Sequence, residues 1–247
     1  MIYIATDLHG NYEIWRQVKE YLQAEDKLIY LGDAIDRGSR GFEIFMEMLD
    51  DPRVIFIKGN HEDLMYNAYF CKDSISAREW LRDWRRNGGR ATQKNMQELE
   101  KNEKITFEQQ LDYIKRIDEL PAYVICPIDG TDDVYYLTHA GFTPSKKLQM
   151  KPIWDQEWDL IWDRKHIDES WPQQYKNIYI IHGHTPIQFL NKKGYNVWDD
   201  KTGLARYADG HKLCLDLGTP RTGIAALYCL NTQEVVEYFT AKPDFQD

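Results

Sequence analysis

The sequence lacks the features that mark secreted disulfide-rich proteins, thiolate metal sites and membrane proteins. It has four cysteines, and no two of them form a Cys-X-X-Cys pair. We therefore interpret them as small buried residues in a reducing cytosol. No apolar run approaches the about 20 residues that a membrane span needs. The first ten residues have no basic segment and reach polar residues within a few positions, so we expect no signal peptide.

The chain also has less positive than negative charge. Its 31 Lys and Arg residues against 40 Asp and Glu residues give a net charge of −9, which argues against broad attraction to nucleic acid or anionic membranes. Local basic clusters could still bind phosphate. Apolar residues make up 43% of the chain, a share typical of globular proteins, and 247 residues suffice to bury a substantial core. We expect a cytoplasmic protein.

Short β-rich runs alternate with helical patterns in the first part of the chain. Residues 11–23 place Ile14, Val18 and Leu22 on one helical face, and residues 40–50 show a similar apolar face. The opening order of strand, helix, strand, helix and strand predicts a layered α/β fold. The runs whose Ile, Val, Tyr and Phe content favours strand are Ile2–Ala5, Lys27–Leu31, Arg53–Ile57, Ala122–Ile125, Val134–Thr138, Asn177–Ile181, Lys212–Leu215 and Ala225–Leu230.

The middle of the chain, Ser74–Glu119, is strongly charged and mostly helical in pattern, with a break at the letters NGGRAT. A structureless loop of that length would be improbable, so we predict a helical insertion within a single domain that spans residues 1–247. Its basic and aromatic side chains either line a substrate groove or belong to an exposed structural helix. Those side chains are Trp80, Trp84, Arg85, Arg86 and Arg90. We read Lys192–Asp209 as a long surface loop near the site.

Polar residues follow five of the predicted strands. In open α/β sheets ligands bind at the carboxyl ends of the strands, so these residues should meet at one edge. Each group alone has a structural explanation, as a helix cap or a buried histidine, but five coincidences at successive strand ends are improbable. The residues are Asp7 and His9, then Asp33, Asp36 and Arg37, then Asn60 and His61, then His139, and finally His182 and His184.

The ligand types in this group narrow the choice of metal. Carboxylates, imidazoles and one amide, with no thiolate, suit Mn²⁺, Fe or Zn²⁺. Six candidate ligands, one of them a carboxylate able to bridge, fit two ions about 3.5–4 Å apart, which can hold a hydroxide nucleophile and clamp a phosphoryl group for in-line attack. The planar fork of Arg37 matches phosphate oxygens.

The motifs DLHG, GDAIDRG, GNHE, THAG and HGHT resemble, in order, those of the calcineurin-like metallophosphoesterase superfamily. The letters DRG, GNHE, RRNGGRAT and DLIWDR are similar to those of its phosphoprotein phosphatase group, especially the bacterial and phage members. The resemblance runs from Met1 to about Leu230. It implies a four-layer α/β/β/α sandwich with the helical insertion at one side of the metal edge.

The resemblance also implies a role for each site residue. Asp33 bridges the two metal ions. His61 is not a ligand and instead donates a proton to the leaving oxygen, while Asp36 holds it charged and oriented. Arg37 and Arg164 bind the phosphate. The remaining metal ligands are Asp7 and His9 for the first ion, and Asn60, His139 and His184 for the second.

Two positions need separate comment. The wider superfamily often has a histidine where Pro186 stands, but phosphoprotein phosphatases lack it, so its absence supports that group. His182 lies two residues before His184, and we expect it to lie behind the ligands or to be incidental.

The leading function hypothesis is a two-metal phosphomonoesterase, most simply with Mn²⁺, that acts on phosphoserine and phosphothreonine in proteins. The close alternative is a symmetrical diadenosine tetraphosphate hydrolase, because that family carries nearly the same motifs. A non-catalytic scaffold is disfavoured because the acid, its partner and a phosphate arginine are all present. A phosphodiesterase is disfavoured by the acidic chain and the missing histidine. We expect a phosphorylated protein or small phosphoester as partner, no nucleic-acid scaffold and no membrane, and leave the oligomeric state open.

Overall fold

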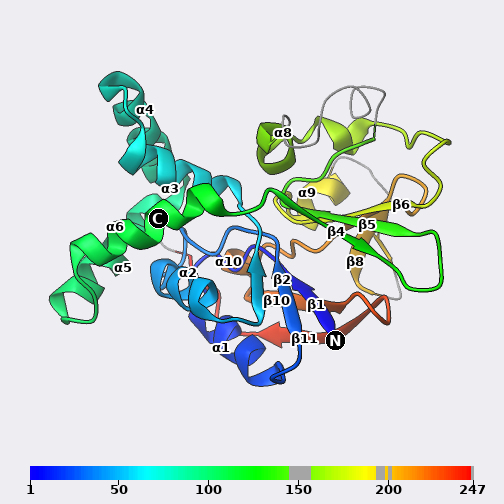
Figure 1. Ribbon diagram of the computed structural model, residues 1–247, viewed down its shortest axis with the longest axis horizontal. Helices are drawn as coiled ribbons and strands as arrows, with labels where there is room; N and C mark the ends of the chain where they lie inside the picture. The colour runs from blue at the N-terminus through cyan, green and yellow to red at the C-terminus, as the bar shows by residue number, and fades with distance from the viewer. Residues whose placement is uncertain (145–156, 193–197, 200–201, 246–247) are drawn as a thin grey trace.

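The computed structural model describes residues 1–144, 157–192, 198–199 and 202–245. Its first sheet has five strands in the order β11-β10-β1-β2-β3, in which β1, β2 and β3 run parallel and β10 runs antiparallel to β1. The parallel pairs place the carboxyl ends of β1, β2 and β3 at one edge (Figure 1). The strands are β1 (Ile2–Ala5), β2 (Lys27–Tyr30), β3 (Val54–Phe56), β10 (Ile224–Cys229) and β11 (Glu234–Thr240).

The second sheet has the strand order β4-β5-β6-β9-β8-β7. Its strands β5, β6 and β9 are parallel, so their carboxyl ends also share an edge. The strands are β4 (Tyr123–Pro127), β5 (Val134–Thr138), β6 (Ile178–His182), β7 (Trp198–Asp199), β8 (Leu204–Tyr207) and β9 (Lys212–Cys214).

The two sheets pack face to face because side chains alternate along each strand. In β1, Ile4 belongs to the core between the sheets together with Ile181 and Leu213, whereas Tyr3 and Ala5 point to the other core. That second core lies under α1 (Tyr12–Tyr21) and α2 (Gly41–Asp50).

The far face of the second sheet is covered as well. Leu160 and Ile161 of α8 (Glu157–Trp162) pack with Ile180, and the 3₁₀ turn η4 (Lys165–Asp168) follows. Figure 1 shows α1 and α2 beside the first sheet and α8 beyond the second sheet. The predicted α/β/β/α layering is therefore confirmed.

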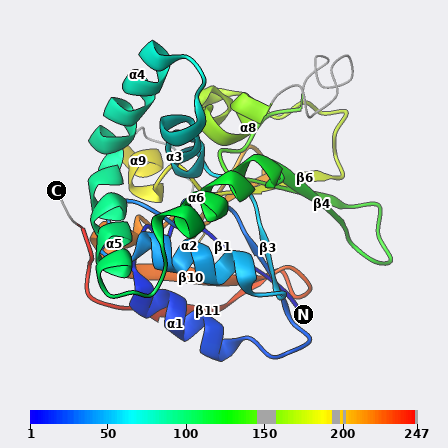
Figure 2. The same cartoon turned by 60° about the vertical axis from the view of Figure 1, so that its left-hand side comes forward.

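The predicted helical insertion is present at Ser74–Glu119. It contains α4 and α5, which Figure 2 shows running end to end along one side of the molecule. The predicted break falls at a π-helical turn in which Gly88 has φ 107°, a left-handed conformation that glycine adopts readily. The single-domain assignment itself stays a prediction. The helices here are α3 (Asn60–Phe70), α4 (Ser74–Trp84), η1 (Arg85–Gly89), α5 (Arg90–Lys101), α6 (Phe107–Lys115) and η2 (Arg116–Glu119).

The prediction of a surface loop at Lys192–Asp209 is wrong for much of that range. Strands β7 and β8 of the second sheet lie inside it, and Leu204, Ala205 and Tyr207 of β8 are buried in the core between the two sheets. The strand was missed because β8 is short and stands among Gly and Asp residues that favour turns. The rest of the predicted loop includes residues 193–197 and 200–201, which lie outside the described residues. Among the helices described, none is both long and apolar enough to cross a membrane.

Candidate active site

The predicted metal ligands, together with Asp36, Arg37 and His61, lie just beyond the ends of β1, β2, β3, β5 and β6, in loops or in the first turn of α3. Several non-glycine residues in these loops have positive φ, which only a few per cent of such residues adopt. The left-handed conformation costs about 1–3 kcal/mol per residue and persists where surrounding contacts hold it, often at functional sites. The positive φ angles belong to Asp7 (53°), His9 (45°), Asp33 (61°), Asp36 (70°), Arg37 (64°) and His184 (65°).

One cluster of possible ligands forms around His9. Its Nε2 atom lies 3.8 Å from Oδ1 of Asp7 and 3.5 Å from Oδ2 of Asp33, and all three side chains are buried. The Nδ1 atom of His9 lies 2.8 Å from the carbonyl oxygen of Ile35. A carbonyl only accepts, so Nδ1 carries the proton and the lone pair of Nε2 faces the carboxylates. Burial and the adjacent Arg37 lower the pKa of His9 well below its usual value.

A second cluster forms on the other side of Asp33. Nε2 of His139 lies 3.4 Å from Oδ1 of Asp33, 2.9 Å from Oδ1 of Asn60 and 3.1 Å from Nδ1 of His184. Nδ1 of His184 lies 2.8 Å from the same Asn60 oxygen. Each oxygen of Asp33 therefore faces a different cluster. Gly59 permits this approach, because a Cβ atom there would lie 2.3 Å from Oδ1 of Asp33.

These clusters offer carboxylate, imidazole and amide donors around two points, a set that fits two divalent ions. Burial opposes a charge on His139, but the carboxylates of Asp33 and Asp7 and the hydrogen bond to the carbonyl oxygen of Leu31 together outweigh burial and raise the pKa of His139 to about 9. Burial and His139 hold the pKa of His184 well below its usual value, so its imidazole is in the neutral form that binds metals. His139 therefore binds a proton at the point where the oxygen and nitrogen donors meet. A metal cation bound at this point would displace that proton.

His61 lies beside the cluster of His9 and Asp33 but is engaged on its other side. Its Nδ1 atom lies 2.7 Å from Oδ2 of Asp36, and its Nε2 atom lies 3.7 Å from Oδ2 of Asp33. By distance alone His61 could join the cluster of His9 and Asp33. The bond to Asp36 fixes the ring so that Nε2 faces the site.

Two residues of the insertion hold Asp36, and the sequence did not reveal them as parts of the site. Nε1 of Trp84 donates to both carboxylate oxygens of Asp36 at 3.0 Å, and Oγ1 of Thr92 donates to Oδ1 at 2.6 Å. Trp84 is fully buried. Trp84 therefore fits neither of the two alternatives, a groove-lining residue or part of an exposed helix, because its indole is buried and its N–H is directed at Asp36.

The two predicted phosphate arginines lie on opposite sides of the ligands. Nη1 and Nη2 of Arg37 lie 2.7 Å from Nε2 of His9 and 2.9 Å from Nε2 of His61. Arg164 donates through Nε to Oγ1 of Thr185 at 3.1 Å and through Nη2 to the carbonyl oxygen of His184 at 3.2 Å. Both arginines line a cavity of about 470 Å³ that also reaches His184. The cavity therefore has guanidinium groups beside the ligand clusters.

Glu62 has a larger part than the sequence indicated. Its buried carboxylate accepts the backbone N–H groups of Asp33 at 2.8 Å, Ala34 at 2.9 Å and Gly59 at 3.1 Å. Burial, followed by repulsion from Asp33, raises the pKa of Glu62 to about 8. The carboxyl group thus joins the loops after β2 and β3. Helix α3 begins at Asn60 with Gly59 as its N-cap, so the open alternative of Asn60 as a capping residue is wrong.

His182 is buried but faces away from the ligand clusters. Its Nε2 atom lies 2.7 Å from the hydroxyl of Tyr207, and its Nδ1 atom lies 2.9 Å from the carbonyl oxygen of Gly183. It therefore supports the loop that carries His184 without pointing at the ligands.

Comparison with known proteins places this geometry in a family. The model of calcineurin-like phosphoesterases matches residues 1–219. No curated protein sequence matches the chain significantly. Among solved structures, a protein assigned as a diadenosine tetraphosphatase is similar, with a TM-score of 0.57 at 13% identity over 100% of this chain and 94% of that one.

Two further structures are similar in fold. One is a protein serine/threonine phosphatase from Saccharomyces cerevisiae with similarity to human phosphatase PP5, with a TM-score of 0.53 at 15% identity over 97% of this chain and 79% of that one. The other is a metallophosphoesterase from Sphaerobacter thermophilus, with a TM-score of 0.50 at 17% identity over 96% and 88% of the two chains. At these identities the similarity concerns the fold alone.

Proposed function

The chain belongs to the calcineurin-like phosphoesterase family, and from that premise we propose that it is a metal-dependent phosphomonoesterase acting on phosphoserine and phosphothreonine residues of proteins. Membership of the family implies a hydrolase with a dinuclear metal centre. The protein substrate, the identity of the metal and the role of each residue are our proposals. A cytoplasmic location stays a prediction.

The proposed ligands divide between the two clusters, with Asp33 shared by both. We favour Mn²⁺ for both ions, and Fe or Zn²⁺ would suit the same mixture of oxygen and nitrogen donors. When bound, such ions supply an activated water and neutralise charge on the phosphoryl oxygens. The first ion would be held by Asp7, His9 and Asp33, and the second by Asp33, Asn60, His139 and His184.

The observation that carries the proposal is the pair formed by His61 and Asp36. The leaving group of a phosphoserine is an alkoxide, which needs a proton as it departs. Nε2 of His61 faces the site, so it can give that proton, while the carboxylate 2.7 Å from Nδ1 stabilises the imidazolium and keeps the ring in place. Arg37 and Arg164 would bind the remaining phosphoryl oxygens through charge-assisted hydrogen bonds.

A symmetrical diadenosine tetraphosphate hydrolase is the second candidate. It would use the same ligands, and the exposed arginines Arg85, Arg86 and Arg90 lie around a hollow that begins at Arg37. Those arginines favour a substrate with negative charge beyond the scissile phosphate, as a tetraphosphate has. The two candidates therefore differ in whether the negative charge beyond the scissile phosphate belongs to a polypeptide or to the remaining phosphates of a dinucleotide.

A substrate panel tests the proposal. Protein loaded with Mn²⁺ is assayed with a phosphoserine peptide, p-nitrophenyl phosphate and diadenosine tetraphosphate, and kcat/KM is compared. We expect the phosphopeptide and the small ester to be hydrolysed and the dinucleotide to be a poor substrate. Efficient turnover of the dinucleotide with little peptide activity would replace our proposal with the second candidate. Bound metal with no activity on any substrate would favour a scaffold.

A further inference from the structure

The helical insertion carries a row of arginines that starts beside the active site. Arg78, Arg82 and Arg86 are spaced four residues apart along α4 and into η1, so they share one helical face. Arg90 follows at the start of α5, beyond the kink at Gly88. Arg85 lies next to this row. All five side chains are exposed, in a chain whose net charge is −9. We call these five residues the arginine strip.

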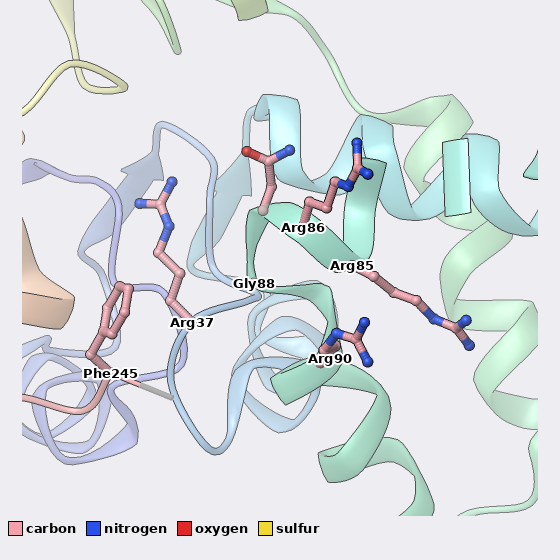
Figure 3. A pocket seen from close by; sticks show the side chains of 7 residues that line it. Arg37, Arg85, Arg86, Gly88, Arg90 and Phe245 are labelled. Atoms are coloured by element: carbon pink, nitrogen blue, oxygen red, sulfur yellow. The ribbon is translucent and has the colours of Figure 1, made fainter. Parts of the chain in front are cut away.

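The strip is continuous with the cavity of the active site. Arg37 and Phe245 line that cavity and also a hollow of about 420 Å³, whose other side consists of Arg85, Arg86 and Arg90 around Gly88. Figure 3 shows Arg37 and Phe245 on one side of the turn at Gly88 and the three arginines on its other side, with Arg85 extending away from Arg37. A further hollow of about 380 Å³ shares the same three arginines and extends outward. Its additional lining residues are Arg78, Leu81 and Arg82.

The start of the strip is held rigidly against the site. The backbone N–H of Arg37 donates to the carbonyl oxygen of Gly88 at 3.3 Å. A Cβ atom at Gly88 would lie 2.8 Å from both the backbone nitrogen and Cγ of Arg37, so the close approach requires glycine. Trp84 and Thr92, on either side of this turn, donate to Asp36. A ligand on the strip would therefore have a defined position relative to the catalytic histidine.

The charge of the strip is mostly unneutralised. Over the part of the chain that the structure describes, Arg78, Arg86 and Arg90 form no ion pair, and Arg85 donates to the neutral amide of Gln93. Arg82 is the exception, since its Nε lies 3.3 Å from Oδ1 of the exposed Asp83. Five like charges side by side repel one another, and an anionic partner would relieve that repulsion.

We propose that the arginine strip binds an acidic segment flanking the phosphorylated residue of a protein substrate, a proposal that rests on the phosphoprotein phosphatase function above. The twelve steps from Arg78 to Arg90 span at most about 18 Å at about 1.5 Å per residue, because the kink at Gly88 interrupts the helix. An extended peptide covers that length with about five or six residues at about 3.3 Å each. Aspartate, glutamate or a further phosphoserine within that distance would meet the guanidinium groups.

Two observations favour a peptide over a dinucleoside polyphosphate. The strip is longer than a chain of four phosphates, so Arg78 and Arg82 would lie beyond the last phosphate. A nucleoside base is also bound well by stacking on an aromatic ring, but Phe245 lies at the inner end of the strip beside Arg37, and the outer hollow has no aromatic ring among its lining residues. An acidic polypeptide meets the whole strip without such a surface.

The test compares phosphoserine peptides of equal length that carry Glu or Gln on the N-terminal flank, the C-terminal flank or both. We expect kcat/KM to be about five- to tenfold higher for a peptide with glutamates on the bound flank, since exposed pairs contribute modestly but several act together. The triple variant Arg78→Gln, Arg82→Gln, Arg86→Gln should lose this preference. Its kcat/KM for p-nitrophenyl phosphate should stay unchanged, because that ester does not reach the strip.

A matched control replaces three exposed lysines elsewhere, Lys27→Gln, Lys115→Gln and Lys176→Gln, and changes net charge equally. This control should retain the preference for acidic peptides. If both triple variants lose it equally, overall charge is responsible and the strip proposal is wrong. Equal kcat/KM values for the Glu and Gln peptides in the unsubstituted protein would also overturn the strip proposal. So would a strip variant that loses kcat/KM for diadenosine tetraphosphate alone.

A binding measurement separates this inference from the proposed function. Fluorescence anisotropy of labelled Glu and Gln phosphopeptides gives their Kd values without turnover. Tighter binding of the Glu peptide that the strip variant abolishes supports the strip even if the phosphopeptide is not hydrolysed. Equal Kd values for the two peptides reject the strip even if hydrolysis is efficient.

Discussion

The ligand clusters and the arginine strip lie beside adjoining cavities that share Arg37 and Phe245, but they are built differently. Asp33, His61 and His139 are buried and held by hydrogen bonds from several loops, some with left-handed backbone. The strip arginines are exposed, and most make no ion pair with a described residue. Buried charges interact strongly because water is excluded, whereas exposed charges are screened. The contrast indicates that the fold holds the buried residues of the ligand clusters in fixed positions. The exposed arginines, which we propose set substrate preference, can be substituted without disturbing the fold.

The largest effect should come from Asp33→Asn. Each oxygen of Asp33 faces one cluster, at 3.5 Å from His9 and 3.4 Å from His139, so one substitution weakens both metal sites. We expect metal content to fall and kcat/KM to drop for every substrate by more than the about 10²–10⁴-fold attributed to a general acid. Metal analysis and kinetics measure this.

The matched control for that experiment is Asp26→Asn, a buried aspartate that pairs with the N-terminus far from the site. It should retain metal and activity. Full occupancy of both metal sites in Asp33→Asn would contradict the assignment of Asp33 as the shared ligand.

The next largest effect should come from His61→Asn. The variant should keep its metal and lose about 10²–10⁴-fold in kcat, because the leaving oxygen no longer receives a proton. The loss should be greater for phosphoserine than for p-nitrophenyl phosphate, whose leaving group needs less protonation. His211→Asn, in a histidine stacked on Trp171, serves as control. Loss of metal would show that His61 acts as a ligand, and an equal loss of kcat with both substrates would contradict its role as the proton donor.

A smaller effect should follow Trp84→Phe, which removes the hydrogen bond that the insertion gives to Asp36. Hydrogen bonds to charged groups contribute about 1.5–3 kcal/mol, so we expect kcat to fall at least about tenfold with metal content unchanged. Trp15→Phe is the matched control, since Trp15 is a buried indole that donates to Glu47 at 2.8 Å away from the site. If Trp84→Phe and Trp15→Phe are destabilised to a similar degree and also lose the same amount of kcat, Trp84 has only a structural role.

The sequence predicted best what depends on local pattern. The apolar runs gave β1 and β5 with their observed bounds and the helical insertion at Ser74–Glu119. Polar residues after successive strands predicted which side chains would meet, and Asp33, Asn60, His139 and His184 do lie within hydrogen-bond or near-contact distance. This succeeds because the carboxyl ends of parallel strands converge whatever the loops between them.

The sequence could not predict what depends on packing between distant segments. Trp84 and Thr92 lie 48 and 56 residues from Asp36 along the chain, and the bonds between them exist only because α4 and α5 fold back over the site. Strand β11 was missed because its residues are largely exposed and do not alternate cleanly. The division of the roles of His61 and Asn60, neighbours in sequence, came from family resemblance and stays a prediction.

The smallest effect, and the one that separates the two regions most directly, is that of salt. Raising the ionic strength from about 0.1 M to about 1 M shortens the Debye length from about 10 Å to about 3 Å. The preference for acidic over neutral phosphopeptides should then fall several-fold, because the strip is exposed to solvent. Turnover of p-nitrophenyl phosphate should change much less, since Asp33, His61 and Asp36 are buried. If salt lowers kcat/KM equally for the acidic phosphopeptide and for p-nitrophenyl phosphate, the strip is not screened more strongly than the buried ligand clusters, and the contrast between the two regions is wrong.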